Sequence, residues 1–179
     1  NPSTQAQALY SWILWETGRH EEAVRVIRKV VDVEPTTAQW QSDLGWLLWA
    51  IPDSAGSRAA AARAIALDST FYEPYHLLTW LELTQRNVAA GRAALQRART
   101  AAGGDFWFRE TLDGLLAVAA GDTAAARAIL ARLRNDPRYA QRGWLARVLG
   151  DVDGSYALFN KAIDTRDPDA LHTLWSNPA

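Results

Sequence analysis

Apolar residues recur along this chain with the 3.6-residue period of amphipathic helices, and the predicted helices come in pairs. The stretch 38–69 illustrates the pattern, because it predicts two short helices separated by a break at Pro52. When the sequence is shifted by 34 residues against itself, this stretch aligns with its neighbours and tryptophans fall into one column, formed by Trp12, Trp46 and Trp80. A fixed period of about this length predicts a solenoid of stacked helical hairpins.

Five helix pairs account for most of the chain, which we therefore treat as one all-α domain over residues 1–179. The first helix of the fourth pair is expected to begin at the aromatic triplet 106–108. The fifth pair is shorter, so its first helix loses a turn. Residues 168–176 are expected to form a capping helix or, alternatively, the first helix of a sixth repeat. The expected repeats are approximately 4–35, 37–69, 71–103, 105–137 and 138–167.

Helix-ending and helix-capping residues separate the two helices of each pair. Gly18 follows the first predicted helix, where a glycine commonly adopts the left-handed conformation that ends a helix. In the second pair, Asp53 or Ser54 can cap the next helix. The third pair is joined at Arg86-Asn87, one period after the break in the second. These signals place the turns independently of the apolar pattern.

Composition and charge narrow the range of partners. The formal net charge is −1, and the basic residues are scattered along the chain, whereas a surface that follows phosphates needs a basic stripe. We therefore expect no nucleic-acid partner. No apolar run approaches the length of a membrane span, so we expect no membrane insertion. The chain has no cysteine, which leaves the compartment open, and its amino end lacks signal-peptide features, which favours the cytoplasm.

The period and its turn residues resemble the tetratricopeptide repeat family, whose pattern is W-x2-L-G-x2-Y, A-x3-F and P within 34 residues. Leu44-Gly45-x2-Leu48, Ala23-x3-Ile27 and Pro35 carry the match, and the fifth unit adds Phe159 at the corresponding spacing. The resemblance implies a right-handed α-solenoid that binds a peptide or protein segment. The closing stretch 164–175 is also similar to repeat arrays at the carboxyl ends of larger bacterial regulators, and the bias toward arginine and alanine would suit a bacterial genome rich in G and C.

In the resembled family, the first helix of each repeat lines a concave face, and one position in it points into the groove. In this chain that position holds Trp12, Trp46 and Trp80, then Gly114 or Leu115, and then Trp144. A half-exposed row of indoles is costly unless something covers it. The alternative is that these rings pack on one another and only tighten the superhelix. The full expected groove comprises Trp12, Trp15, Asp43, Trp46, Trp49, Glu73, His76, Trp80 and Trp144.

The polar members of this set lean acidic and include no lysine or arginine. We therefore expect no clamp for a peptide's terminal carboxylate. Indole faces and carboxylates both attract guanidinium groups, so the groove suits an apolar or arginine-bearing segment. A second candidate is an interaction patch at Phe106, Trp107 and Phe108, with packing between repeats as the favoured alternative.

Signals of catalysis are weak. The three histidines lie on different repeats, no spacing typical of metal ligands occurs, and the chain lacks a glycine-rich phosphate loop. Asp151-x-Asp153-Gly154 resembles the start of a calcium loop, but helix capping explains it better. We therefore expect a non-catalytic module without cofactor or metal. The alternatives are a self-associating scaffold segment, which would form a homodimer, and a sensor of an apolar small ligand.

Overall fold

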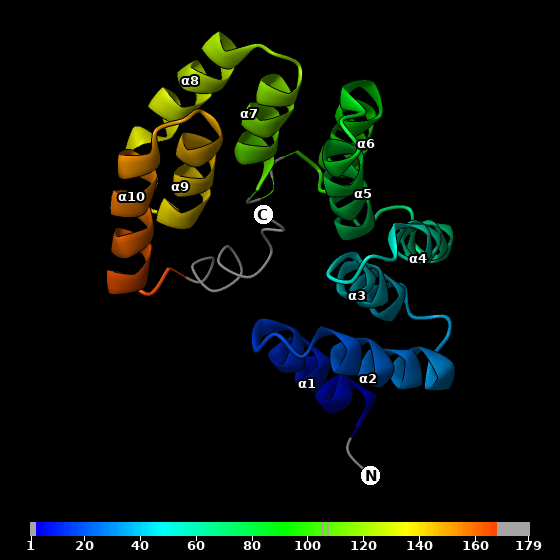
Figure 1. Cartoon of the computed structure of the whole chain (residues 1–179). Coiled ribbons are helices and arrows are strands. Elements are labelled where there is room, and N and C mark those ends of the chain that lie inside the picture. The colour runs from blue at the N-terminus through cyan, green and yellow to red at the C-terminus, as the bar shows by residue number, and fades with distance from the viewer. Residues whose placement is uncertain (1–2, 105, 107, 168–179) are drawn as a thin grey trace.

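The computed structural model describes residues 3–104, 106 and 108–167, and all regular structure in this part is helical. In these described residues, ten α-helices and one short 3-10 turn follow one another (Figure 1). The first helices of the pairs are α1 (Thr4–Glu16), α3 (Ala38–Trp49), α5 (Glu73–Thr84), α7 (Arg109–Ala119) and α9 (Tyr139–Val148). The second helices are α2 (His20–Val33), α4 (Ser54–Leu67), α6 (Val88–Ala101), α8 (Thr123–Arg132) and α10 (Val152–Asp164), and the 3-10 turn η1 spans Leu133–Asn135.

The five helix pairs stack in sequence order, which confirms the predicted solenoid. The two helices of each pair pack on each other, and each second helix packs on the first helix of the next pair, except that the fifth pair contacts the fourth mainly through α9 and α7. Figure 1 shows the pairs following a curve, with α3, α5, α7 and α9 on its inner side and α4, α8 and α10 on its outer side. The first helices of the second to fifth pairs therefore line the inner face of the curve, as the resemblance implies.

The turn between the two helices of a pair combines two features, which occur together in the third, fourth and fifth repeats. The second residue after the first helix takes a positive φ in every repeat except the second, and this φ is 77° at Gly18, 81° at Gly121 and 86° at Gly150. Glycine carries no Cβ and adopts this conformation without strain. An aspartate or asparagine then caps the second helix by accepting a hydrogen bond from a backbone N–H three residues on, as at Asp122, whose carboxylate is 2.9 Å from the Ala125 nitrogen.

The start of the fourth repeat differs from the sequence-based expectation. Helix α7 begins at Arg109, so the aromatic triplet precedes the helix rather than opening it. Phe106 and Phe108 are both buried in the cluster that joins the third and fourth repeats. The connection 102–108 is longer than the connections 34–37 and 68–72 before α3 and α5. The two phenylalanines fill the space that this longer connection spans.

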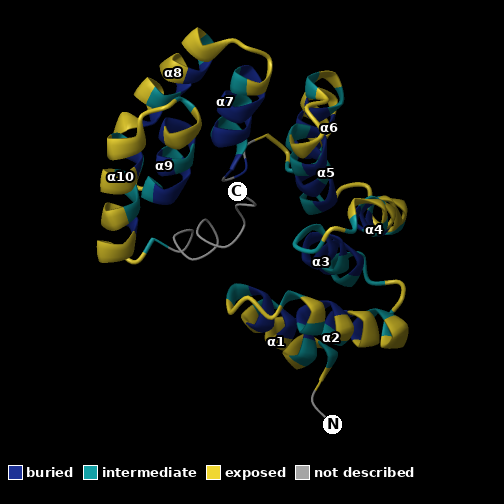
Figure 2. Ribbon diagram, viewed as in Figure 1, coloured by how far each residue is buried: buried dark blue, intermediate teal, exposed yellow. Residues whose placement is uncertain are grey.

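Burial follows the hairpin interiors. Figure 2 shows the buried residues on the facing sides of each pair, whereas the outer sides of α4, α8 and α10 are exposed.

Small residues let the helices approach closely. A Cβ added at Gly45 on α3 would lie 2.7 Å from Leu77 Cδ2, and one at Gly143 on α9 would lie 2.8 Å from the Phe159 ring. Glycines inside these helices are therefore packing residues, which offsets their poor helix propensity.

Candidate binding surface

Aromatic rings of the first helices meet in one connected group, which we call the tryptophan cluster and define as Trp12, Trp46, Trp49, Trp80 and Trp144. The ring centroids lie 5.9 Å apart for Trp46 and Trp49, 5.9 Å for Trp49 and Trp80, and 5.7 Å for Trp80 and Trp144. Trp12 packs against the same group from α1. Trp49 thus connects Trp46 and Trp80, two members of the predicted column, and Trp80 in turn contacts Trp144.

The members of the cluster differ in exposure. Trp46 is only 8% exposed and packs among Ala61, Leu77 and Leu81, whereas the other four are half-buried. Trp46 is therefore mainly a packing residue. The half-buried rings are stabilised by their neighbours and still present part of their surface to solvent.

Trp15 does not belong to this surface, which corrects the expected groove. Its side chain is 1% exposed and lies with Leu14 and Ile27 in the core between the first and second repeats. Trp15 follows Trp12 by three residues and meets it edge to face, with ring centroids 5.5 Å apart. Trp12 and Trp15 lie on the same side of α1, but α2 and the second repeat cover Trp15 fully and leave Trp12 half-buried.

The expected acidic lining is also less exposed than the sequence indicates. Asp43 on α3 is buried, and its carboxylate accepts a hydrogen bond from the Gln39 amide at 2.9 Å. Burial, helped by the nearby charge of Glu73, raises the pKa of Asp43 to about 7, although hydrogen bonds from Gln39 and Trp12 oppose the shift. Glu73, which is half-buried at the start of α5, therefore carries the acidic character of this side.

His76 is held in aromatic surroundings. Its ring centroid lies 5.1 Å from that of Trp46 and 5.7 Å from that of Phe108, and its Nε2 atom accepts a hydrogen bond of 3.0 Å from the Trp80 indole. Because an accepting Nε2 carries no proton, a neutral ring has its hydrogen on Nδ1. His76 is buried, so it orients the Trp80 indole from beneath rather than contacting a ligand itself.

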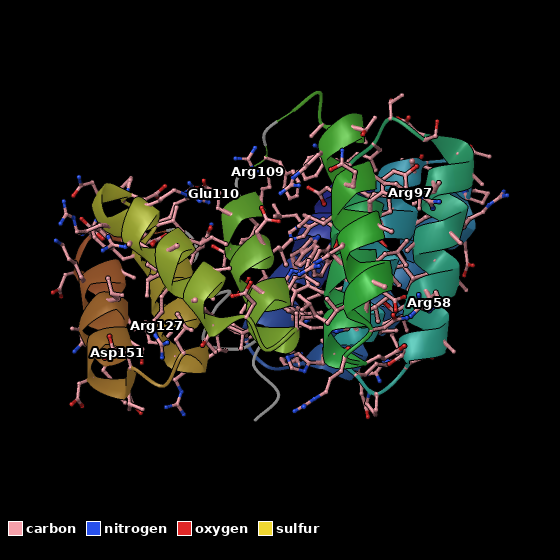
Figure 3. All side chains as sticks on the ribbon, turned by 90° about the horizontal axis from the view of Figure 1, so that it is seen from above. Arg58, Arg97, Arg109, Glu110, Arg127 and Asp151 are labelled. Carbon is pink, nitrogen blue, oxygen red and sulfur yellow. The ribbon has the colours of Figure 1, made fainter. Side chains whose placement is uncertain are left out.

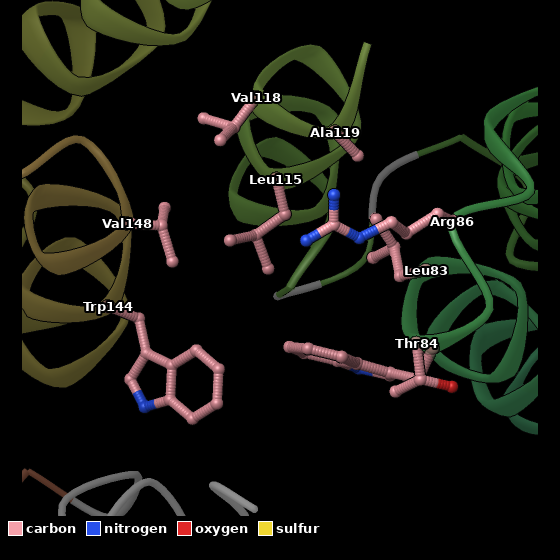
Figure 4. Close-up of a pocket in the computed structure, with 9 residues that line it drawn as sticks. Leu83, Thr84, Arg86, Leu115, Val118, Ala119, Trp144 and Val148 are labelled. Carbon is pink, nitrogen blue, oxygen red and sulfur yellow. The ribbon is translucent and has the colours of Figure 1, made fainter. Parts of the chain in front are cut away.

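A cavity of about 370 Å³ opens where the third, fourth and fifth repeats meet (Figure 4). Its walls come from α5, α7 and α9 and are mostly apolar. Leu115 on α7 lies between the two tryptophan walls, whereas a Cβ on Gly114 would come 2.7 Å from Leu145 Cδ2. Leu115 therefore continues the tryptophan column in the fourth repeat. The cavity is lined by Trp80, Leu83, Thr84, Arg86, Leu115, Val118, Ala119, Trp144 and Val148.

Arg86 was not among the residues expected at this surface. It lies in the turn after α5 and has a φ of 56°, which is unusual for a residue with a Cβ. Figure 4 shows its side chain reaching from this turn toward Leu115, over the cavity. The signal that identifies it is positional, because Gly18, Gly121 and Gly150 occupy the corresponding turns in other repeats.

The second candidate surface is mainly a packing site. Phe106 lies 5.3 Å from Tyr72, and Phe108 lies 5.7 Å from Trp80, measured between ring centroids. Both phenylalanines are buried, which agrees with the favoured alternative of packing between repeats. Trp107 lies outside the described residues.

Within the described ranges, no three His, Cys, Asp or Glu side chains gather where they could hold a metal ion. Among the helices of the same part of the chain, none has both the length and the apolar character needed to cross a membrane. Charged side chains are spread over the outer helices, as the view of all side chains in Figure 3 illustrates with Arg58, Arg97 and Arg127.

Residues 4–37 match the family model of the tetratricopeptide repeat, whereas no curated protein sequence matches the chain. A thermophilic tetratricopeptide repeat protein of Thermus thermophilus is similar in structure, with 15% identity, coverage of 97% of each chain and a TM-score of 0.74. A tetratricopeptide repeat protein of Parabacteroides merdae is 14% identical, with coverage of 97% of this chain and 70% of that chain and a TM-score of 0.74. Pseudomonas aeruginosa pilF is also 14% identical, with coverage of 95% and 87% and a TM-score of 0.64.

Sequence identities this low establish a common fold and nothing more specific. The repeat matched by the family model coincides with the first helix pair, α1 and α2. The following four pairs repeat its arrangement of two helices joined by a short turn. The chain thus contains a tetratricopeptide repeat at residues 4–37 and has the fold of tetratricopeptide repeat proteins.

Proposed function

We propose that the inner face of this solenoid binds a peptide or protein segment, and that the chain acts as a non-catalytic interaction module. Tetratricopeptide repeats generally mediate protein–protein interaction and are typically non-catalytic. The observation that carries the proposal is the half-buried part of the tryptophan cluster beside the cavity between α5, α7 and α9. Aromatic side chains that are fixed by their neighbours and partly exposed are effective binding anchors.

The shape of this surface favours a chain segment over a compact ligand. Tryptophans continue from the cavity wall at Trp80 to Trp49 on α3 and then to Trp46, through successive ring contacts of 5.9 Å. Trp46 is already buried, but an occupant that filled only the cavity would leave the exposed part of Trp49 uncovered. An extended segment would cover the cavity and the row together. Its expected chemistry is apolar or aromatic, with a basic side chain toward Glu73.

Panning a library of random dodecapeptides against the immobilised protein tests this function. Val148→Glu places a charge in the cavity at a position that is 42% exposed, so the fold should tolerate it. Val33→Glu is the matched control, because Val33 is also the last residue of a helix and lies outside the cavity lining. Enriched peptides should lose about tenfold or more in affinity for Val148→Glu and bind Val33→Glu normally. If no sequence is enriched, the proposal fails.

Self-association is a second candidate, favoured by an exposed apolar stripe on α1. Leu9 is 63% and Ile13 is 53% exposed. The positions equivalent to Ile13 in the second and third repeats, one and two periods of 34 residues later, are Leu47 and Leu81. Both are fully buried against the preceding repeat. The α1 stripe therefore has the character of a repeat-to-repeat contact, which a second copy of this chain could cover.

Sedimentation velocity at two protein concentrations tests this second candidate. Self-association should raise the weight-average sedimentation coefficient with concentration in the wild type. The double variant Leu9→Ser and Ile13→Ser should remain monomeric, whereas Val33→Ser should behave as the wild type. A concentration-independent monomer in the wild type would eliminate this candidate and leave peptide binding untouched.

A further inference from the structure

Arg86 occupies a backbone position that other repeats give to glycine. Its N–H donates to the Leu83 carbonyl at 3.0 Å, and the Asn87 N–H donates to the Glu82 carbonyl at 2.9 Å. Gly121 and Asp122 make the same two hydrogen bonds at the end of α7, to the carbonyls of Val118 and Ala117. A positive φ is strained for a residue with a Cβ, and glycine would relieve this strain. The structure keeps an arginine at this turn despite that cost.

The Arg86 side chain is placed where its charge meets the cavity. Figure 4 shows the guanidinium between Leu83 and Leu115, facing the side of the cavity formed by Trp144 and Val148. No described residue forms a hydrogen bond or an ion pair with this guanidinium. The other cavity-lining side chains are apolar, except that Thr84 donates its hydroxyl to the Leu81 carbonyl at 2.8 Å. The cavity thus joins apolar walls to one exposed cation at its edge.

We infer that this cavity recognises a large apolar side chain that adjoins an acidic residue in the bound segment, with the carboxylate held by Arg86. The inference rests on the proposed peptide-binding function and specifies its ligand chemistry. A guanidinium pairs well with a carboxylate, because its planar N–H groups can donate two parallel hydrogen bonds to the two oxygens. A volume of about 370 Å³ is at the small end of ligand pockets and accommodates one large side chain with adjoining backbone.

Charge along α5 also sets the direction and spacing of the segment. Glu73 is the first residue of α5, and Arg86 follows its end, so the backbone positions of these two residues are about 20 Å apart along the helix axis at 1.5 Å per residue. An extended peptide covers that distance in about six residues. A segment with a basic residue and an acidic residue about six positions apart would therefore meet both charges.

Panning the same random dodecapeptide library against the wild type and Arg86→Gly tests the inference. Wild-type protein should enrich peptides in which aspartate or glutamate adjoins a large apolar residue. Arg86→Gly should bind these peptides about tenfold or more weakly, because a charge-assisted pair is lost. Its melting temperature should be equal to or above that of the wild type, because the strained φ is relieved. Loss of binding through unfolding is thereby separated from loss of recognition.

Arg166→Gly is the matched control. Arg166 has a φ of 55° and lies after α10, outside the cavity lining. The Arg166→Gly variant should have a melting temperature equal to or above that of the wild type, as Arg86→Gly should, and it should keep the wild-type peptide affinities. Arg86→Glu should reverse the preference from acidic to basic residues next to the apolar side chain.

The outcomes separate this inference from the function on which it rests. Peptides that are enriched without an acidic bias, and that bind Arg86→Gly normally, would overturn the role of Arg86 and leave peptide binding in place. No enrichment at all would instead overturn peptide binding, and the inference with it. Equal loss of affinity in Arg166→Gly would also overturn the inference, because any arginine charge would then suffice.

Discussion

The indole of Trp80 on α5 meets the indole of Trp144 on α9 edge to face, with ring centroids 5.7 Å apart and ring planes at 79°. These residues belong to the third and fifth repeats, so the contact passes the fourth repeat. In a simple solenoid each repeat contacts only its neighbours. The short α9 packs on α7, and this arrangement brings the fifth repeat back toward the third. One wall of the cavity therefore depends on a contact beyond nearest neighbours.

Trp46→Ala should destabilise the fold strongly. The Trp46 ring is buried against Leu77 and Leu81, and it contacts both His76 and Trp49. Removing such a side chain leaves a cavity in the core and costs about 3 to 5 kcal/mol of unfolding free energy. Urea unfolding monitored by circular dichroism measures this loss.

Trp144→Ala provides the comparison, because its ring is half-buried and contacts Trp80 at the cavity wall. An aromatic pair contributes about 0.5 to 1.5 kcal/mol beyond its buried area, so a smaller loss is expected than for Trp46→Ala. Equal losses in the two variants would show that both rings are packing residues. The cavity wall would then have no separate binding role.

The apolar period predicts most helices within one or two residues, because every repeat buries the same positions. The start of α7 is the clear exception. A run of three aromatic residues reads as the opening of a helix, yet Phe106 and Phe108 reach their buried positions from the connection that precedes Arg109. No local propensity encodes how far one repeat lies from the next. The length of the connection determines this distance, and its aromatic side chains fill it.

Asp43→Asn should raise stability at neutral and alkaline pH. The pKa of Asp43 is about 7 in the folded protein and near 3.8 in the unfolded chain, so the folded state binds the proton more tightly between these values. The free energy of unfolding of the wild type therefore falls as pH rises from about 4 to about 7. Above about pH 7 it stays lower by the full cost of burying the ionised carboxylate. A shift of about three units corresponds to at most about 4 kcal/mol.

Urea unfolding of the wild type and Asp43→Asn at pH 4, 6 and 8 checks this expectation. The variant should match the wild type at pH 4 and exceed it at pH 8. Asparagine keeps an oxygen that accepts the hydrogen bond from Gln39, so the substitution mainly removes the charge. A constant difference across the three pH values would mean that Asp43 does not titrate in this range.

The binding surface was harder to predict than the fold. The column of Trp12, Trp46 and Trp80 follows directly from the period, but the period does not distinguish an exposed ring from a covered one. Exposure depends on which neighbouring helix overlies each position. Arg86 was missed for a different reason. Its importance comes from a left-handed backbone conformation, and only a comparison with the glycines of equivalent turns reveals it.

Asp122→Ala should lower stability by about 1 kcal/mol, because the backbone N–H of Ala125 at the start of α8 loses its acceptor. Asp122→Asn keeps an acceptor oxygen and should retain most of the wild-type stability. Thermal unfolding of the two variants gives the comparison. If alanine and asparagine are equally destabilising, the charge at the helix start is responsible rather than the cap.

Gly45→Ala should destabilise the protein even though alanine is the better helix former. A Cβ at this position of α3 would lie 2.7 Å from Leu77 Cδ2 and 3.3 Å from the Ser57 carbonyl oxygen. Leu77 is fully buried, so its side chain has little room to move, and overpacking of this kind typically costs about 1 to 3 kcal/mol. Higher helix propensity returns at most about 1 kcal/mol.

Ala59→Gly is the control for propensity, because Ala59 is exposed in the middle of α4. That variant should lose about 1 kcal/mol through propensity alone. If packing governs Gly45, chemical unfolding will show that both Gly45→Ala and Ala59→Gly are destabilising. One of them replaces glycine by alanine and the other replaces alanine by glycine, so helix propensity alone cannot explain both losses. A stabilised Gly45→Ala protein would mean that propensity dominates at both sites. In that case the close approach of the second and third repeats would not be what selects glycine on α3.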